Sequence, residues 1–305
     1  MNGDPAGRPT DRADDGLPAA TAMGAVTLTV ADLVTVEAFY REALGLARRG
    51  RGDAWAELGT AQATLVRLEQ RPRARPEPTL PGLYHLALLL PDRAALGAWL
   101  LHAVETGVPL QGAADHAVSE AIYLADPEGN GVEVYRDRPR ETWETRLGRI
   151  GMTTDPLDEQ GLTAAAAPRW AGAPDGASVG HVHLQVGDLA RSAAFYGDAL
   201  GFPRTNDAFA GACFLGAGGY HHHLGLNTWG VRGSGSRSAH AAGLRRFEVV
   251  VPGTDALEAA ALRLRRARHA VERQGDGTTL DVRGPDGLEV RLRVERPPAD
   301  GDVTT

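Results

Sequence analysis

A strand that runs directly into a helix is predicted by the stretch Gly180-His181-Val182-His183-Leu184-Gln185-Val186-Gly187-Asp188-Leu189. Its valines and leucine alternate with histidines and a glutamine, so the two sets of side chains face opposite sides of a sheet. Asp188 occupies the N-cap position of the helix that follows, where a short acidic side chain accepts hydrogen bonds from free backbone N–H groups.

The same strand-to-helix pattern occurs three more times, in residues 25–32, 85–92 and 246–253, the last with glycine instead of aspartate at the cap. Shorter matches support the repetition: Phe39-Tyr40 corresponds to Phe195-Tyr196, and the turn at residues 126–129 corresponds to the turn at residues 284–287. A repeat of this kind predicts an α+β fold of four βαβββ units that form two barrels.

The repeat divides the chain into five segments. We expect a disordered leader at residues 1–22, an N-terminal domain of units one and two at 23–138, and a linker at 139–176. Units three and four form a C-terminal domain at 177–296, and residues 297–305 form a tail.

The composition excludes several classes of protein. The 305 residues carry a formal net charge of −7, which argues against a nucleic-acid-binding surface. Cys213 is the single cysteine and lies in an apolar run, so we expect a buried structural thiol. No apolar run is long enough to span a membrane and no signal peptide is recognisable, which predicts a cytoplasmic protein and leaves homo-oligomerisation open.

Equivalent positions of the repeat carry candidate metal ligands. Each unit begins its first strand at an inward position seven residues before the cap, and these positions hold Ala25, His85, His181 and Arg246. Glu133 follows the turn of unit two and faces inward on its last strand. Each of these residues alone would more often be structural, but two imidazoles and one carboxylate at matching positions form a set that suits non-haem Fe(II) better than zinc.

Two further groups are candidates for proton transfer. His221, His222 and His223 follow one another in a segment that we expect to be the last strand of unit three, where His222 would face away from its neighbours. His116 and Tyr123 precede Glu133 and are potential proton donors or acceptors. His183 shares the face of His181, and we expect it to line the site or to be structural.

These motifs resemble the vicinal oxygen chelate superfamily, and the segment from Gly218 to Trp229 is most similar to the two-domain catechol 2,3-dioxygenases (type I extradiol dioxygenases). The resemblance covers residues 24–295. It implies two vicinal-oxygen-chelate barrels and metal ligands His85, Glu133 and His181, with His222 as the acid–base residue and Tyr123 and His116 beside the metal.

The chain departs from that family in one respect. The resemblance implies one histidine from unit three and the other two ligands from unit four, but unit four carries Arg246 and Arg291 at those positions. Matching residues occur in unit two instead. Either units two and three pair in one barrel, or the metal site is incomplete.

The function implied by the resemblance is extradiol ring cleavage of catechol or a substituted catechol with dioxygen, using Fe(II), with Mn(II) as the alternative metal. Two other functions fit the same fold. One is a glyoxalase-like metal-dependent isomerase or thiol transferase, whose sites usually have more carboxylate ligands. The other is a metal-free binding protein that sequesters a ligand, as bleomycin-resistance proteins do.

Overall fold

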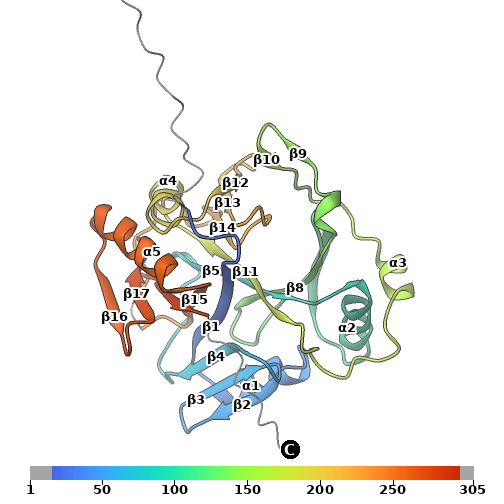
Figure 1. Ribbon diagram of the computed structural model, residues 1–305. Helices are drawn as coiled ribbons and strands as arrows, with labels where there is room; N and C mark the ends of the chain where they lie inside the picture. The colour runs from blue at the N-terminus through green and yellow to red at the C-terminus, as the bar shows by residue number, and fades with distance from the viewer. Residues whose placement is uncertain (1–15, 239, 296–305) are drawn as a thin grey trace, which may run out of the picture.

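The computed structural model describes residues 16–238 and 240–295 and contains two eight-stranded sheets within them (Figure 1). From edge to edge, the first sheet consists of β16 (Val271–Gln274), β17 (Thr279–Arg283), β18 (Glu289–Val294), β15 (Gly243–Val251), β1 (Ala22–Val30), β4 (Thr64–Gln70), β3 (Trp55–Gly59) and β2 (Ala47–Arg51). The second sheet consists of β12 (Arg204–Asn206), β13 (Ala212–Leu215), β14 (Leu224–Asn227), β11 (Ser178–Gln185), β5 (Gly82–Leu89), β8 (Gly131–Asp137), β7 (Ser119–Ala125) and β6 (Leu110–Asp115).

Each sheet combines one unit from each half of the chain. The first joins units four and one through the antiparallel pair β15 and β1, and the second joins units three and two through the antiparallel pair β11 and β5. The pairing of units two and three that the ligand positions require is therefore present. The sheets do not follow the halves 23–138 and 177–296, because each half contributes to both.

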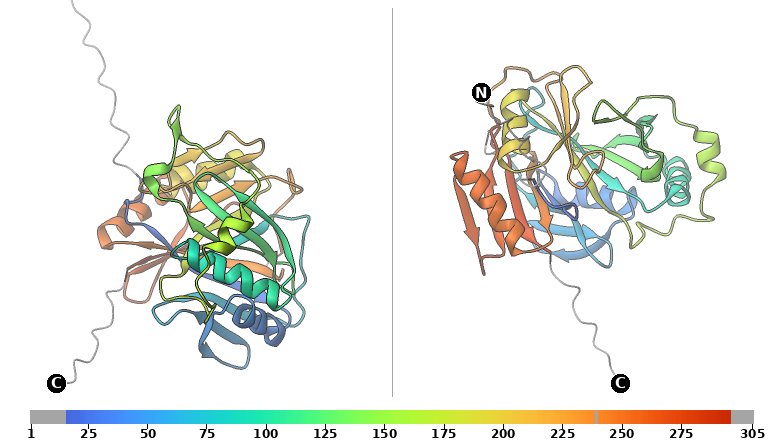
Figure 2. Two further views of the ribbon diagram at one scale, coloured as in Figure 1. Left: turned by 90° about the vertical axis from the view of Figure 1, so that its right-hand side faces the viewer. Right: turned by 45° about the horizontal axis from the view of Figure 1, so that its top comes forward.

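The main helices follow the first strand of each unit. They are α1 (Leu33–Glu42), α2 (Arg93–Glu105), α4 (Leu189–Ala193), which continues as the π-helix η3 (Ala194–Ala199), and α5 (Thr254–Arg266). Asp32, Asp92 and Asp188 accept hydrogen bonds from backbone N–H groups in the first turns, as expected for N-caps, whereas Gly253 offers no side chain. Helix α5 lies along β15 to β18, as the right view of Figure 2 shows.

Side chains along the strands of the second sheet point alternately to the apolar core and to the face that carries the candidate site. Leu86 and Leu88 of β5, Val132 and Val134 of β8, and Val182 and Leu184 of β11 are fully buried in the large apolar core. The intervening residues of the same strands project from the opposite face of the sheet. A strand has a side-chain period of two, so the pattern that fixes the core also fixes which residues face the site.

Several segments differ from the sequence-based expectation. Leu17 in the predicted leader is buried, and its N–H donates to the Gly201 carbonyl over 2.7 Å, while residues 1–15 lie outside the described residues. The predicted linker contains a short 3₁₀-helix, η2 (Arg140–Thr142), the hairpin of β9 (Thr145–Arg146) and β10 (Arg149–Ile150), and helix α3 (Glu159–Ala164). Strands β2 and β6 are the first strands after the helix in units one and two, and the sequence pattern did not locate them because their alternation of polar and apolar residues is weak.

Among the described residues, no helix has the length and apolar character needed to cross a membrane.

Candidate metal centre and cavity

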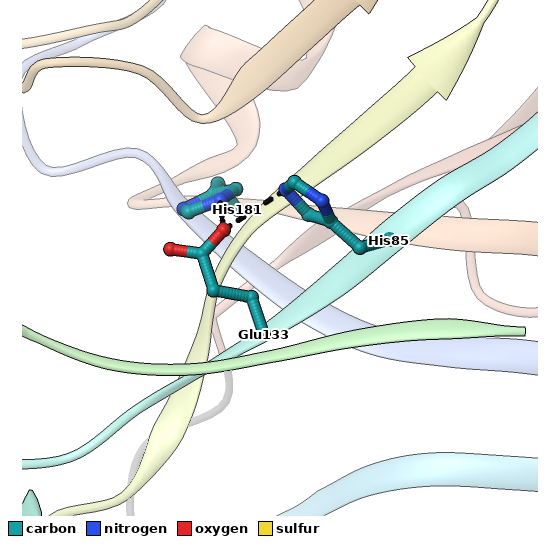
Figure 3. A group of neighbouring side chains, drawn as sticks. All are labelled: His85, Glu133 and His181. Atoms are coloured by element: carbon teal, nitrogen blue, oxygen red, sulfur yellow. Dashed lines mark hydrogen bonds and ion pairs between the residues drawn. The ribbon is translucent and has the colours of Figure 1, made fainter. Parts of the chain in front are cut away.

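Three neighbouring strands bring His85, Glu133 and His181 together. His85 lies on β5, Glu133 on the parallel strand β8 and His181 on the antiparallel strand β11, so the three come from consecutive strands of one sheet. All three side chains are buried, and one ligand atom of each lies within 4.8 Å of the others. Figure 3 shows the two imidazoles and the carboxylate pointing toward one another.

The geometry around Glu133 fits a metal better than a hydrogen-bonded cluster. His85 Nε2 lies 3.0 Å from Glu133 Oε2, and His181 Nε2 lies 3.2 Å from the same oxygen. His85 Nε2 nevertheless forms no hydrogen bond within the described residues, although it is buried. The short contact with Glu133 lacks the alignment of a hydrogen bond, and a buried nitrogen that forms none is costly unless something else binds it. Two imidazole nitrogens and one carboxylate oxygen can hold a divalent first-row ion and leave coordination positions open.

Burial and charge prepare these residues as ligands. Burial alone would raise the pKa of the Glu133 carboxyl, but the adjacent His181 and His85 outweigh it and hold that pKa well below its usual range. Burial lowers the pKa of His181 to about 4 against the opposing effect of Glu133. At neutral pH the site therefore offers a carboxylate and a neutral imidazole at His181, which are the forms that bind metals.

Two of the three residues, His85 and Glu133, line a cavity of about 440 Å³. His85, Glu133, His183 and His222 contribute to its wall, and His181 lies directly behind, with its ring centroid 4.2 Å from that of His222. The rest of the wall is mostly apolar or neutral and comprises Tyr84, Gln111, Gly112, Ala114, His116, Val118, Ser119, Tyr123, Leu124, Gly131, Val132, Met152, Thr153, Thr154, Phe209, Phe214 and Trp229.

His116 and Tyr123 form a hydrogen-bonded pair in this cavity. His116 Nε2 lies 2.7 Å from the Tyr123 hydroxyl, and His116 Nδ1 lies 2.7 Å from the backbone oxygen of Thr153. A carbonyl oxygen only accepts, so Nδ1 carries a proton. In neutral His116 the Tyr123 hydroxyl must then donate to Nε2. In the protonated ring both nitrogens donate, and the hydroxyl proton of Tyr123 can be donated to another acceptor, such as the Glu133 carboxylate.

The three consecutive histidines lie in a turn and not on a strand, which corrects the sequence-based expectation. Strand β14 begins only at Leu224. The strict alternation predicted for a strand is therefore absent, and the side chains of His221 and His222 contact each other, with their Nδ1 atoms 2.8 Å apart. Only His222 of the three lines the cavity. His223 accepts a hydrogen bond from the Ala217 N–H instead.

A chain of hydrogen bonds fixes the protonation of His222. The Asp137 carboxylate lies 2.9 Å from His221 Nε2, and an ionised carboxylate only accepts, so this nitrogen donates. When His221 is neutral, its Nδ1 atom accepts from His222 Nδ1–H. In that tautomer His222 Nε2 carries no proton. Burial, followed by the neighbouring His181, lowers the pKa of His222 well below its usual value.

The cavity also contains residues that we did not single out from the sequence. Asn227 Nδ2 donates to His183 Nε2 over 3.1 Å, which orients that ring in the wall. Phe209 and Met152 reach the cavity from loops and Phe214 reaches it from β13, all far from the candidate ligands in the sequence. A sequence signal existed for Tyr84, which precedes His85, and for Trp229, which ends the histidine segment.

The first sheet has no matching ligand set among the described residues, because the equivalent positions hold Ala25, Arg246 and Arg291, and its polar side chains form ion pairs. Arg291 is paired with Asp281 through two hydrogen bonds of 2.7 Å, and Arg67 and Arg293 both contact Glu248. Within the described residues, the single cluster of histidine, cysteine or acidic residues that could hold a metal is the one in the second sheet.

Fold and site together define an α+β protein of repeated βαβββ units with, among its described residues, one buried group that could hold a metal ion. A comparison with protein families matches residues 22–134 and 178–292 to the Glyoxalase/Bleomycin resistance protein/Dioxygenase superfamily. The chain belongs to this superfamily, as the sequence-based resemblance predicts.

Comparisons with individual proteins agree with this assignment. The chain is 42% identical over 258 residues to a catechol-2,3-dioxygenase of Bacillus subtilis (strain 168), covering 83% of this chain and 90% of the relative. A solved structure of a putative dioxygenase from Bacillus subtilis has a TM-score of 0.62 at 12% identity and covers 90% of this chain and 86% of its own. Glyoxalase I from Zea mays has a TM-score of 0.55 at 19% identity, with 90% and 92% covered. These two structures support the fold alone.

Proposed function

We propose that this protein is an Fe(II)-dependent extradiol dioxygenase that cleaves the ring of catechol or a substituted catechol. The observation that carries the proposal is the buried set of His85, Glu133 and His181 beside a cavity. The relative that shares 42% of its residues over most of both chains is named catechol-2,3-dioxygenase, which agrees with the same reaction.

The ligand set favours iron over the alternatives. Two imidazoles and one carboxylate on neighbouring strands are typical of non-haem Fe(II) sites with open positions, and Mn(II) is the alternative ion. When bound, the iron would supply adjacent positions for the two diol oxygens and the redox chemistry that dioxygen requires. The residues of the chain must then orient the diol and transfer its proton.

His222 is placed to accept that proton. Its Nε2 atom is unprotonated in the tautomer in which Nδ1 donates to neutral His221, and the residue lines the cavity next to His181. A neutral imidazole that reaches the catechol hydroxyl can act as the general base. The same nitrogen, once protonated, can return the proton to the product.

Tyr123 takes part through its hydroxyl group. It donates a hydrogen bond to a substrate oxygen when His116 is protonated, and it presents an acceptor when His116 is neutral. The backbone oxygen of Thr153 keeps His116 in the orientation that allows this exchange.

The deciding experiment is a metal analysis of protein purified without oxygen, followed by incubation with catechol and dioxygen. We expect roughly one iron per chain and a yellow ring-opened semialdehyde. Bound Ni or Zn with isomerase activity toward a thiol adduct would favour the glyoxalase-like function instead. Tight binding of an aromatic ligand that does not depend on any metal would favour a sequestering protein.

A further inference from the structure

The cavity is much larger than an unsubstituted catechol requires. At about 440 Å³ it falls within the range of roughly 300–1,000 Å³ that is typical of pockets for drug-sized ligands. A catechol is a single ring with two hydroxyl groups and would occupy only the end of the cavity next to His85, Glu133 and His222. The remaining volume must accommodate a substituent.

The charge of the lining restricts that substituent. The sequence contains no lysine, and none of the residues that line the cavity is an arginine. The polar groups away from the metal ligands include Gln111, Ser119, Thr153 and Thr154, which carry no charge, and His116, whose two ring nitrogens are already bonded to the Thr153 oxygen and to Tyr123. A carboxylate or sulfonate on the ring would lose its hydration there without a permanently charged lysine or arginine to pair with, and that loss is costly.

A continuous aromatic wall leads from the ligands to the solvent. The ring centroid of Tyr84 lies 5.3 Å from that of His85 and 5.6 Å from that of Trp229, and Trp229 lies 5.9 Å from His183. Phe214 continues the wall and lies 4.9 Å from His222.

The outer end of this wall is open. Tyr84 and Trp229 remain 42% and 41% exposed, so the wall ends in two half-exposed rings at the surface. Rings at such distances favour edge-to-face and offset contacts with an apolar or aromatic group.

Resting on the proposed dioxygenase function, we infer that the substrate is an uncharged catechol with a bulky apolar substituent, such as an aryl or alkyl group. The diol lies at His85, Glu133 and His222, and the substituent lies against Tyr84, Trp229 and Phe214. Removal of this apolar surface from water favours binding of the substituted ring over catechol itself.

The test measures dissociation constants by calorimetry on the metal-reconstituted protein without oxygen. The probes are catechol, 3-phenylcatechol, 4-phenylcatechol and 3,4-dihydroxybenzoate. We expect one of the phenylcatechols to bind at least about tenfold more tightly than catechol, since even one buried methylene is worth about tenfold, and the benzoate to bind more weakly than catechol.

Substitutions of two tryptophans test whether the aromatic wall itself binds the substituent or whether loss of any half-exposed tryptophan weakens binding. Trp229→Ala should weaken phenylcatechol binding by about three- to tenfold and change catechol binding less than about twofold. Trp229→Phe should restore much of the lost affinity for phenylcatechol. Trp55→Ala is the matched control, because Trp55 is similarly exposed at 45% but lies on β3 of the other sheet. It should leave all four dissociation constants unchanged.

Equal binding of catechol and both phenylcatechols, or preferred binding of the benzoate, would overturn the inference. Preferred binding of a phenylcatechol that the iron-loaded protein fails to cleave in the presence of dioxygen supports the ligand class and overturns the proposed dioxygenase function. The two proposals therefore fail in different measurements.

Discussion

His85 and His181 lie on paired antiparallel strands from different halves of the chain, with ring centroids 5.5 Å apart and both Nε2 atoms directed at Oε2 of Glu133. This relationship exists because β5 pairs with β11 and not with a strand of its own half. A shared ion at this point would connect units two and three.

Loss of a ligand should remove the metal without unfolding the sheet. We expect His85→Ala and Glu133→Ala to weaken metal binding by more than about 100-fold, since even residues that only support ligands contribute 10–100-fold. Metal titration and elemental analysis measure the effect. His102→Ala is the control, because His102 lies on α2 and bonds the Glu42 carbonyl. Full metal occupancy in His85→Ala would reject the ligand assignment.

His222→Ala should retain its metal and lose turnover. A general base contributes about 10²–10⁴-fold, so we expect a loss in kcat of that size. His221→Ala should cause a smaller loss, because His221 only orients His222, and His223→Ala should have the least effect, because its ring bonds the Ala217 N–H outside the cavity. Steady-state kinetics on the metal-loaded variants measure the three values of kcat. An inactive His223→Ala variant would contradict the expected order.

Tyr123→Phe should lower kcat and leave metal content unchanged. The substitution removes one hydroxyl and keeps the ring beside His85, whose centroid lies 5.6 Å away. We expect a loss of about 10–100-fold if the hydroxyl contacts the substrate, which corresponds to about 1.4–2.7 kcal/mol. His116→Gln should produce part of the same loss. Unchanged kinetics in Tyr123→Phe would show that its hydroxyl is not used.

A chain divided at Leu147 and Gly148 should reassemble only from both fragments. The two residues form an exposed turn with positive φ angles of 52° and 74° between β9 and β10, so a break there disturbs little. Each fragment alone would expose the edges of two unpaired strands, β1 and β5 or β11 and β15, and should be insoluble. Co-expression should yield a metal-binding complex, and a fragment that folds alone with full secondary structure by circular dichroism would contradict this.

Glu37 should stabilise the first sheet in a pH-dependent manner. Its carboxylate is buried and accepts a hydrogen bond from Arg51 Nε over 2.9 Å, with Arg48 also bound. Burial would raise the pKa of Glu37, but the two arginines outweigh it and lower the pKa below its usual value of 4.5. A lowered pKa in the folded state contributes stability above the unfolded pKa, and this contribution is lost as the pH falls through the folded value.

We therefore expect Glu37→Gln to reduce the free energy of unfolding by about 1–3 kcal/mol at pH 7, because both arginines are partly exposed. The difference from the parent protein should shrink below about pH 4. Urea unfolding at the two pH values measures this. Glu258→Gln is the control. The pair of Glu258 and Arg273 is exposed, so it should contribute nothing measurable to the free energy of unfolding.

The sequence alone determined what depends on local pattern. Period-two alternation assigned Val182 and Leu184 to the core and His181 to the site, and short acidic side chains marked the starts of three helices. Repetition of the unit then predicted the fold class and the ligand positions, because equivalent positions in repeated units occupy equivalent places in a sheet.

Only the tertiary structure decided what depends on residues far apart in the chain. Strand pairing across the two halves placed His85 beside His181. The segment before Leu224 is a turn and not the expected strand, and this turn directs His222 toward the cavity and His221 toward Asp137. Loops supplied Phe209, Met152 and the Thr153 carbonyl. Local pattern fixes which face of a strand a side chain occupies, but contacts between distant segments depend on the packing of the whole chain, which no local pattern encodes.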